Sequence, residues 1–306
     1  MHWLHNTRLY KTIKSYYEGK NISVRILFVV FGFGILLFLV RGSTTMEVRL
    51  PGQQSLSFAG QEAPTDGVYS MNQERYDREH ALTALDPAQI VMIHKRWNLY
   101  MPMIEDALDD ANLPQDLQYI PVIESALRNV ALSTAGAAGI WQFMPDTARR
   151  YGLVVDDFVD ERLDPVKSTE AAVRYLRDLY TDFNEDVFLT AAAYNRGENG
   201  LQRDLSRQGV STFWDAQLNS ETSRYIFRLI AMKQVWENRH TYVDGDVLGA
   251  GYIAPDTKTV RAWQIDNLAT WAKDNGYTYT QIKYLNPWIV GNQLPLGDWE
   301  ISVFDI

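Results

Sequence analysis

The sequence predicts a mainly α-helical protein with an N-terminal transmembrane helix and a small C-terminal βααβ unit. Three observations support this prediction. An apolar run near the N-terminus is almost free of charge, apolar residues recur at three- and four-residue spacing between residues 86 and 240, and strand-like segments appear only after residue 256. No stretch between residues 86 and 240 has the pattern of a long strand.

The composition is that of a folded protein and excludes several classes of chemistry. Of the 306 residues, 46% are hydrophobic and 22% are charged, which is ordinary for a globular chain. The absence of cysteine excludes disulfides, Cys-ligated zinc and thiol nucleophiles. The histidines form no i,i+4 ligand pair, so we expect neither a metal site nor a cofactor; they are His2, His5, His80, His94 and His240.

Charge is unevenly distributed along the chain. The formal net charge is −9, although residues 1–41 carry six Lys or Arg and a single Glu. The rest of the chain is therefore strongly acidic, which argues against a nucleic-acid partner, because binding nucleic acid needs a basic face.

Residues 22–40 are expected to be a membrane anchor. Only Arg25 interrupts this apolar run, and Ile26–Val40 would span roughly 22 Å as a helix, close to a bilayer span with its flanks. The basic tail of residues 1–21 would stay in the cytoplasm, so that the protein is expected to cross the cell inner membrane once, with the domain that follows in the periplasm. A cleaved signal peptide is the alternative, but Arg41 stands where a small residue would be wanted.

Residues 41–80 are rich in small and polar residues, and they are expected to form a periplasmic linker with a short ordered piece near Tyr69–Tyr76. A helical domain is expected over residues 81–245. Its first helix begins at Asp86-Pro87, where Asp can cap the N-terminus and Pro suits the first helical position.

The remaining helices of this domain follow the same rules. A second helix runs from Tyr119 to Leu127, with Pro121 kinking it just before Glu124. Further helices begin at Pro145, at Asp164-Pro165 and at "ETSRY", and another ends at Gly197. Residues 256–306 form the βααβ unit, with "KTVRAW" and "DWEISVF" as its strands.

Glu124 is the candidate for acid–base chemistry. It lies in an apolar helical segment, where loss of solvation would raise its pKa and keep it protonated near neutrality. A protonated carboxyl is what a general acid needs. The alternative is a partly exposed Glu near a helix end, which is common.

Two further stretches contain residues suited to binding a sugar. In "STAGAAGIWQFM", Trp141 offers a flat apolar face and Gln142 an amide for hydroxyl or acetamide groups. These aromatic residues could equally belong to the core, and for Phe143 the core is favoured. In "AAAYNRG", Tyr194 and Asn195 project from a helix end after a run of alanines.

The stretches "ES", "STAGAAGIWQFMPDTARRYG", "DERLDPVKSTEAAVRYL", "AAAYNRG" and "ETSRY" together resemble the lytic transglycosylases of the soluble lytic transglycosylase family, from about Asn112 to Trp236. The resemblance implies a lysozyme-like catalytic domain in which Glu124 is the single catalytic acid/base. It also implies that Tyr194 hydrogen-bonds the catalytic carboxyl, that Trp141 and Met144 line the groove, and that Tyr225 gives support. The implied substrate-binding residues are Ser125, Ser133, Trp141, Gln142, Met144, Tyr194, Asn195 and Glu221.

The single acid bears on the reaction. Hydrolysing glycosidases usually use two carboxyl groups, whereas the resemblance implies that Glu124 alone cleaves the MurNAc–GlcNAc bond of peptidoglycan glycan strands and leaves 1,6-anhydro-MurNAc ends. One alternative is a lysozyme-type hydrolase, which would need a second carboxylate from Asp146, Asp156, Asp157 or Asp160. Another is a non-catalytic wall-binding protein.

The C-terminal unit resembles a LysM module, which grips N-acetylglucosamine polymers. The likeness is carried by Asn286-Pro287, Pro295, Gly297 and the closing "ISV". The usual Gly-Asp opening is replaced by "RAWQIDN", so this degenerate unit is expected either to bind sugar or to act as a structural cap.

Overall fold

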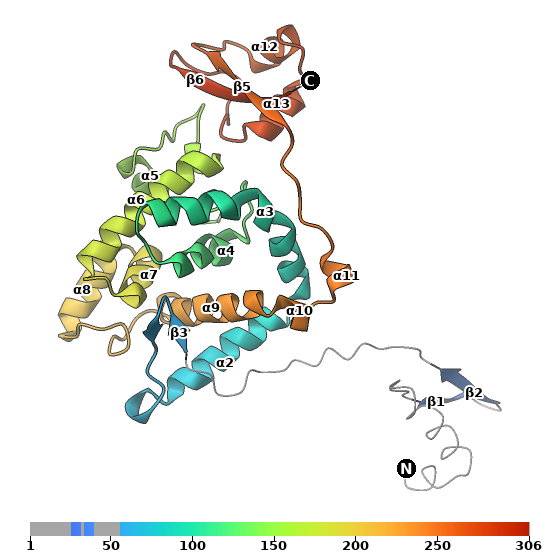
Figure 1. Cartoon of the computed structure of the whole chain (residues 1–306), viewed down its shortest axis with the longest axis vertical. Helices are drawn as coiled ribbons and strands as arrows, with labels where there is room; N and C mark the ends of the chain where they lie inside the picture. Colours follow the sequence, from blue (N-terminus) through green and yellow to red (C-terminus); the bar gives the residue numbers. More distant parts are fainter. Residues whose placement is uncertain (1–25, 32–33, 40–55, 306) are drawn as a thin grey trace. The chain divides into compact units, whose positions relative to one another are not determined.

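The computed structural model describes residues 26–31, 34–39 and 56–305 (Figure 1). The chain divides into two units, residues 1–47 and residues 48–306.

The first unit contains an antiparallel hairpin of β1 (Ile26–Phe31) and β2 (Gly34–Leu39), with Ile26 opposite Leu39. This differs from the helix expected over residues 22–40. The β-branched and aromatic residues of "ILFVVF" favour a strand, and glycine within the run disfavours a helix. The expected cytoplasmic tail, residues 1–21, lies outside the described residues. In the part of the chain that the structure describes, no helix has both the length and the apolar character needed to cross a bilayer.

The second unit begins with folded structure where the linker was expected. Strands β3 (Ser57–Phe58) and β4 (Gln61–Glu62) form a small hairpin, followed by a 3-10 turn at Gly67–Tyr69 and the helix α2 (Met71–Ala84). The linker prediction therefore fails from residue 56 onward. The reason is that α2 buries mainly polar residues, such as Asn72, Glu79 and His80, beside Tyr76, so it lacks the apolar stripe that identifies a packed helix.

The helical domain contains the predicted helices and three that were not predicted, α8, α10 and α11. The bounds are α3 (Pro87–Asp110), α4 (Tyr119–Ser125), α5 (Pro145–Arg150), α6 (Pro165–Asp182), α7 (Val187–Arg196), α8 (Glu198–Gln208), α9 (Ser220–Glu237), α10 (Arg239–Tyr242) and α11 (Gly245–Leu248). Further 3-10 turns lie at Gln115–Gln118 and Glu161–Leu163.

The helix starts predicted from Asp-Pro pairs are confirmed. The Asp86 side chain accepts a hydrogen bond from the Gln89 amide, and the Asp164 side chain accepts from the amides of Val166 and Lys167. Each cap satisfies a backbone N–H that has no partner inside its helix.

Helix α9 is the centre of the helical domain. It contacts α2, α4 and α7, and in Figure 1 it lies between α2 and α4. Its side chains Leu229 and Ile230 are fully buried, and burying each contributes about 1.5–3 kcal/mol. The fully buried alanines Ala191–Ala193 of α7 are small enough to let that helix approach α9 closely.

The C-terminal unit has the predicted βααβ order. Strand β5 (Thr257–Ala262) pairs antiparallel with β6 (Trp299–Phe304), and α12 (Leu268–Asp274) and α13 (Tyr279–Leu285) lie between them in sequence. The unit has its own hydrophobic cluster, which includes Leu268, Ile282 and Ile301. One member of that cluster, Val159, comes from the helical domain.

Candidate active site

A cleft of about 500 Å³ in the helical domain gathers most of the predicted site residues. Glu124 lies at the C-terminal end of α4, and the wall is completed by residues from the glycine-rich loop (Ser133–Met144), from α5 and α6, and from the ends of α7 and α9. The lining residues are Glu124, Ser133, Ala135, Ala137, Gln142, Phe143, Met144, Thr147, Tyr175, Tyr194, Asn195, Arg196, Gly197 and Glu221.

The chain turns sharply directly after Glu124 and Ser125. Ala126 and Leu127 both have left-handed backbone angles, with φ of 52° and 56°. Non-glycine residues are uncommon there, and such strain concentrates at functional sites. The turn is held from α3, because Arg96 Nη1 donates a hydrogen bond to the Ala126 carbonyl at 3.0 Å. Helix α4 therefore ends just after Glu124, with that side chain at the cleft.

The environment of Glu124 favours the protonated acid. Burial raises its pKa above the usual Glu value, although the Tyr225 hydroxyl and the positive charge of Arg228 act in the opposite direction; the carboxylate of Glu221 raises it further. The Tyr225 hydroxyl donates to Glu124 Oε1 at 2.6 Å. A carboxyl group that is held in place and whose pKa is raised by burial is suited to donate a proton to a bound substrate.

The structure corrects the role expected for Tyr194. Its hydroxyl donates to the Trp141 carbonyl at 2.8 Å rather than to Glu124. The phenol that reaches the Glu124 carboxyl is that of Tyr225, from α9. Tyr194 still lines the cleft beside Glu124, and it fastens the glycine-rich loop to α7.

Two of the expected substrate-binding residues lie outside the cleft lining. Trp141 is fully buried and donates its Nε1 hydrogen to Thr169 Oγ1 at 2.9 Å, so the expectation that it lines the groove is wrong. The Ser125 hydroxyl faces two backbone carbonyls, at 3.1 Å from Pro121 and 2.8 Å from Ile140. Ser125 thus ties the end of α4 to the glycine-rich loop.

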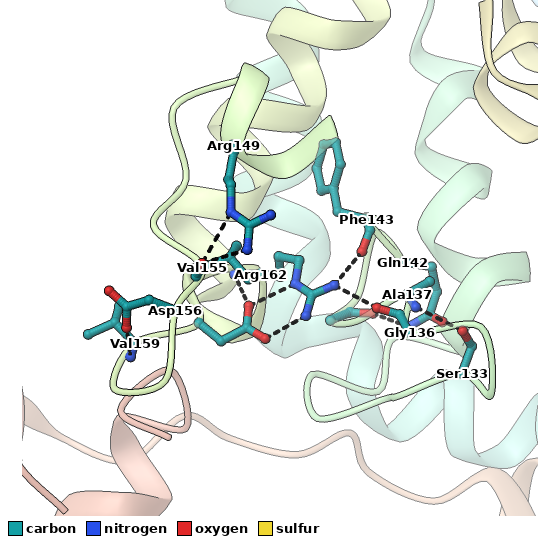
Figure 2. Close-up of polar contacts among 12 residues, drawn as sticks. Ser133, Gly136, Ala137, Gln142, Phe143, Arg149, Val155, Asp156, Val159 and Arg162 are labelled. Atoms are coloured by element: carbon teal, nitrogen blue, oxygen red, sulfur yellow. Dashed lines mark hydrogen bonds and ion pairs between the residues drawn. The ribbon is translucent and has the colours of Figure 1, made fainter. Parts of the chain in front are cut away.

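The glycine-rich loop, Ser133–Met144, presents three of the expected residues to the cleft. Ser133 Oγ accepts a hydrogen bond from the Ala137 amide at 2.9 Å (Figure 2). Gln142 has a φ of 51° and donates its amide hydrogens to the carbonyls of Gly139 and Ala131. Met144 is 45% exposed and offers an apolar contact. Phe143 is 3% exposed, as expected of a core residue, yet its edge reaches the cleft wall.

A polar cluster closes the cleft on the side of α7 and α9. Asn195 Nδ2 donates to Glu221 Oε1 at 3.0 Å, and Asn195 Oδ1 accepts from the Thr222 hydroxyl at 2.8 Å. These bonds fix the orientation of the Asn195 amide. The expected pair Asn195 and Glu221 is thus brought together in the cleft.

Sequence reasoning missed Thr147, Tyr175 and Arg196 as cleft residues. Tyr175 lies on α6 three residues after the buried Ala172 and four before Leu179. That spacing placed it on the buried face of the helix but did not show that this face reaches the cleft. Arg196 and Thr147 lie next to residues that had been singled out, at helix ends where projection into a site is common.

The expected second carboxylates of a hydrolase are placed elsewhere. Asp146 is fully exposed, Asp156 accepts hydrogen bonds from the amides of Phe158 and Val159, and Asp160 is ion-paired with Arg162. None of these, nor Asp157, lines the cleft. The one other carboxylate among the lining residues is Glu221.

Comparison with known proteins finds similarity in two parts of the chain. Residues 101–217 match the family model described as Transglycosylase SLT domain, and residues 259–299 match that of the Soluble lytic transglycosylase C-terminal LysM-like domain. The chain is 38% identical over 147 residues to Membrane-bound lytic murein transglycosylase D of Escherichia coli K12, covering 47% of this chain and 32% of that protein. It is 35% identical over 104 residues to Peptidoglycan transglycosylase gp16 of Escherichia phage T7, covering 33% of this chain and 8% of the phage protein.

Among solved structures, the 70 kDa soluble lytic transglycosylase SLT70 of Escherichia coli is similar, with a TM-score of 0.41 and 20% identity over 58% of this chain and 33% of that one. The chain spans about a third of the length of the Escherichia coli transglycosylase D that it matches, at 32%.

Proposed function

Residues 101–217 belong to the lytic transglycosylases of the SLT family, and from this premise we propose that the protein cleaves the β-1,4 bond between MurNAc and GlcNAc in peptidoglycan and leaves 1,6-anhydro-MurNAc ends. The observation that supports this most is Glu124, which is held by Tyr225 in a cleft lined with hydrogen-bonding and apolar groups and has a raised pKa.

Glu124 acts twice in the proposed reaction. Its proton passes to the glycosidic oxygen as the bond to C1 of MurNAc breaks, and the acetamide group of the sugar stabilises the positive charge at C1. The Glu124 carboxylate then removes the proton from the C6 hydroxyl, whose oxygen bonds to C1. The acid is regenerated, and no water is consumed.

Tyr225 and Arg228 support the charged stage of this cycle. The Tyr225 hydroxyl donates to the carboxyl group, and the positive charge of Arg228 favours the carboxylate, so both stabilise Glu124 after it has lost its proton. Burial acts the other way and favours the acid. The opposed effects keep both protonation states of Glu124 accessible.

Sugar binding is proposed for the residues that line the cleft. Asn195 and Gln142 offer oriented amides, Ser133 a hydroxyl, Met144 an apolar surface and Tyr194 an aromatic one. Glu221 is proposed to hold Asn195 in place.

The second candidate is a lysozyme-type hydrolase, and the observation that favours it is Glu221, a second carboxylate in the same cleft. Mass spectrometry of peptidoglycan digested by the full-length protein separates the two. Anhydro-muramyl ends support the transglycosylase, and reducing ends would instead show hydrolysis, for which Glu221 is the candidate base that activates water. Release of no fragment would favour a wall-binding protein.

Membrane attachment through residues 22–40 is also proposed, with the helical domain in the periplasm. The support is the apolar sequence of this segment and the basic residues that precede it. The Escherichia coli relative is named as a membrane-bound transglycosylase. Cell fractionation tests it: the full chain should sediment with membranes, and a chain lacking residues 1–41 should not. Recovery of both in the same fraction would contradict the anchor.

A further inference from the structure

The C-terminal unit is fastened directly to one segment of the catalytic domain, Phe158–Asp160. The Phe158 carbonyl accepts hydrogen bonds from the amides of Val290 and Gly291 at 2.9 and 3.1 Å, and the Asp160 amide donates to the Trp288 carbonyl at 2.8 Å. Val159 is fully buried within the hydrophobic cluster of the C-terminal unit. The two parts therefore share both a short ladder of backbone bonds and a common core.

Two residues farther on, Arg162 reaches from this segment to the glycine-rich loop. Its side chain is 7% exposed and forms a two-point ion pair with Asp160, at 2.8 and 2.7 Å. Its remaining Nη1 donates to the carbonyls of Gly136 and Phe143 at 2.7 and 2.9 Å, as Figure 2 shows. These two carbonyls flank the part of the loop that carries Gln142 into the cleft.

The loop also rests on the backbone of Arg162. A Cβ atom added to Gly139 would lie 1.8 Å from the Arg162 carbonyl oxygen, so the two backbones are in direct contact. Within the loop, Ala138 and Phe143 exchange a pair of backbone hydrogen bonds, each at 3.1 Å. The loop is thus a closed turn held from outside by Arg162.

We propose that Arg162 is a positioning residue for the cleft, and that the C-terminal unit acts through Phe158–Arg162 to hold the glycine-rich loop in its substrate-binding geometry. A buried guanidinium needs its carboxylate partner, because an unpaired buried charge is strongly unfavourable. Asp160, the partner, is itself fixed at its backbone by Trp288. Undocking the C-terminal unit would free Asp160, loosen Arg162 and release the loop. Only the activity readout of this inference rests on the proposed function.

Hydrogen exchange of the full-length protein tests the coupling without substrate. Val159→Asp places a charge in the shared core, and Gly291→Phe places a bulky side chain where a Cβ atom would already lie 3.2 Å from Phe158. Both variants should speed exchange at the amides of Asp160, Val290 and Gly291, and also at those of Ala137–Phe143, by about tenfold or more. Gly291→Phe is informative even if Val159→Asp fails to fold, since it lies outside the catalytic domain.

Matched controls place the same kinds of side chain on exposed positions. Val166→Asp, on the 52% exposed Val166 of α6, and Leu296→Phe, on the 78% exposed Leu296 of the C-terminal unit, should leave exchange of the glycine-rich loop at the wild-type rate.

Arg162→Lys tests the positioning role itself. Lysine keeps the charge opposite Asp160 but lacks the planar fork that reaches two carbonyls at once. Exchange of Ala137–Phe143 should rise about tenfold while the amides of Val290 and Gly291 stay protected. In peptidoglycan digestion, KM should rise about fivefold with kcat nearly unchanged, whereas a loss of folded enzyme alone would lower the apparent kcat and leave KM unchanged.

Two results would overturn the inference. In the first, the amides of Asp160, Val290 and Gly291 lose protection while Ala137–Phe143 does not, so that docking and loop are independent. In the second, those three amides remain protected in both docking variants, so that Val159 and Gly291 do not hold the unit. If the wild-type protein releases nothing from peptidoglycan, the proposed function fails, and the exchange results still decide the coupling.

Discussion

Two buried glutamates contact consecutive residues of α9, Arg224 and Tyr225. They show how the partner of a buried carboxyl group can give it one of two different roles. Glu79 of α2 is 3% exposed and is paired at two points with Arg224, at 2.7 and 2.9 Å. Glu124 of α4 is held by the next residue, Tyr225, through one hydrogen bond of 2.6 Å. A guanidinium fixes one carboxylate, and a neutral phenol holds the other.

The difference lies in the charge of the partner. Arg224 supplies a full positive charge, so that Glu79 has its charge matched and its oxygens occupied, which is a structural arrangement. Tyr225 supplies a hydrogen bond without a charge, and burial outweighs both this bond and the positive charge of Arg228, so that the pKa of Glu124 is raised. Neighbouring positions on one helix thus contact a carboxylate with a structural role and the carboxyl group that we propose as the acid.

The largest effect should come from removing the proposed catalytic acid. Glu124→Gln keeps the shape of the side chain and its hydrogen bond from Tyr225 but has no proton to give, so the rate of glycan cleavage should fall about 10²–10⁴-fold. The matched control is Glu79→Gln, whose folded fraction should keep near wild-type activity. Release of muropeptides from purified peptidoglycan measures both, and substantial residual cleavage by Glu124→Gln would exclude the single-acid mechanism.

Glu79→Gln should instead lower stability. It removes the charge opposite Arg224, and since the Arg224 side chain is 41% exposed, solvent compensates part of the loss. We expect a decrease of about 1–3 kcal/mol in the free energy of unfolding, measured by urea denaturation. An unchanged midpoint would mean that the pair between α2 and α9 contributes nothing.

Tyr225→Phe should change the pH dependence of cleavage. The Tyr225 hydroxyl lowers the pKa of Glu124, so its removal raises that pKa further. Glu124 of the variant then loses its proton at a higher pH, so the basic limb of the kcat/KM profile should move upward in pH. The rate should also fall about tenfold, because the Glu124 carboxylate is less stabilised. Tyr194→Phe is the control, because its hydroxyl bonds the Trp141 carbonyl and its loss should leave the limb in place.

The smallest effect concerns the stability of Glu124→Gln across pH. Because the pKa of Glu124 is raised in the folded protein, its protonated form contributes stability that is complete below the usual Glu value and is lost as pH rises through the folded-state pKa. The variant lacks this loss, so its stability relative to wild type should be greater at pH 7 than at pH 4. An equal difference in unfolding free energy between variant and wild type at both pH values would mean that folding does not shift the pKa of Glu124.

Much of the fold could be predicted from local chemistry, whereas contacts between distant segments could not. Two Asp-Pro pairs correctly predicted helix starts, at Asp86-Pro87 and Asp164-Pro165, and a helix end was correctly predicted at Gly197. Helix α2 was missed because its packed face is polar, and β-branched and aromatic residues at 26–31 form a strand where a helix was expected.

The sequence predicted which residues form the site better than it predicted the contacts between them. Glu124, Gln142, Asn195 and Glu221 meet in one cleft, but the partner of Glu124 comes from 101 residues away in sequence, and no local pattern distinguishes Tyr225 from Tyr194. Trp141 was misplaced because the group that holds it in the core, the Thr169 hydroxyl, comes from 28 residues away in sequence.

The contact between Gly139 and Arg162 also limits which sequences this loop can accept. At residue 139 even a methyl group would overlap the Arg162 backbone, and no rotamer can avoid an atom at the first carbon. Gly136, with a φ of 90°, has open space around its Cβ position, so its restriction is conformational and Asn is the most tolerable replacement. A library randomised at both positions and selected for folding should return glycine alone at 139 and a mixture at 136.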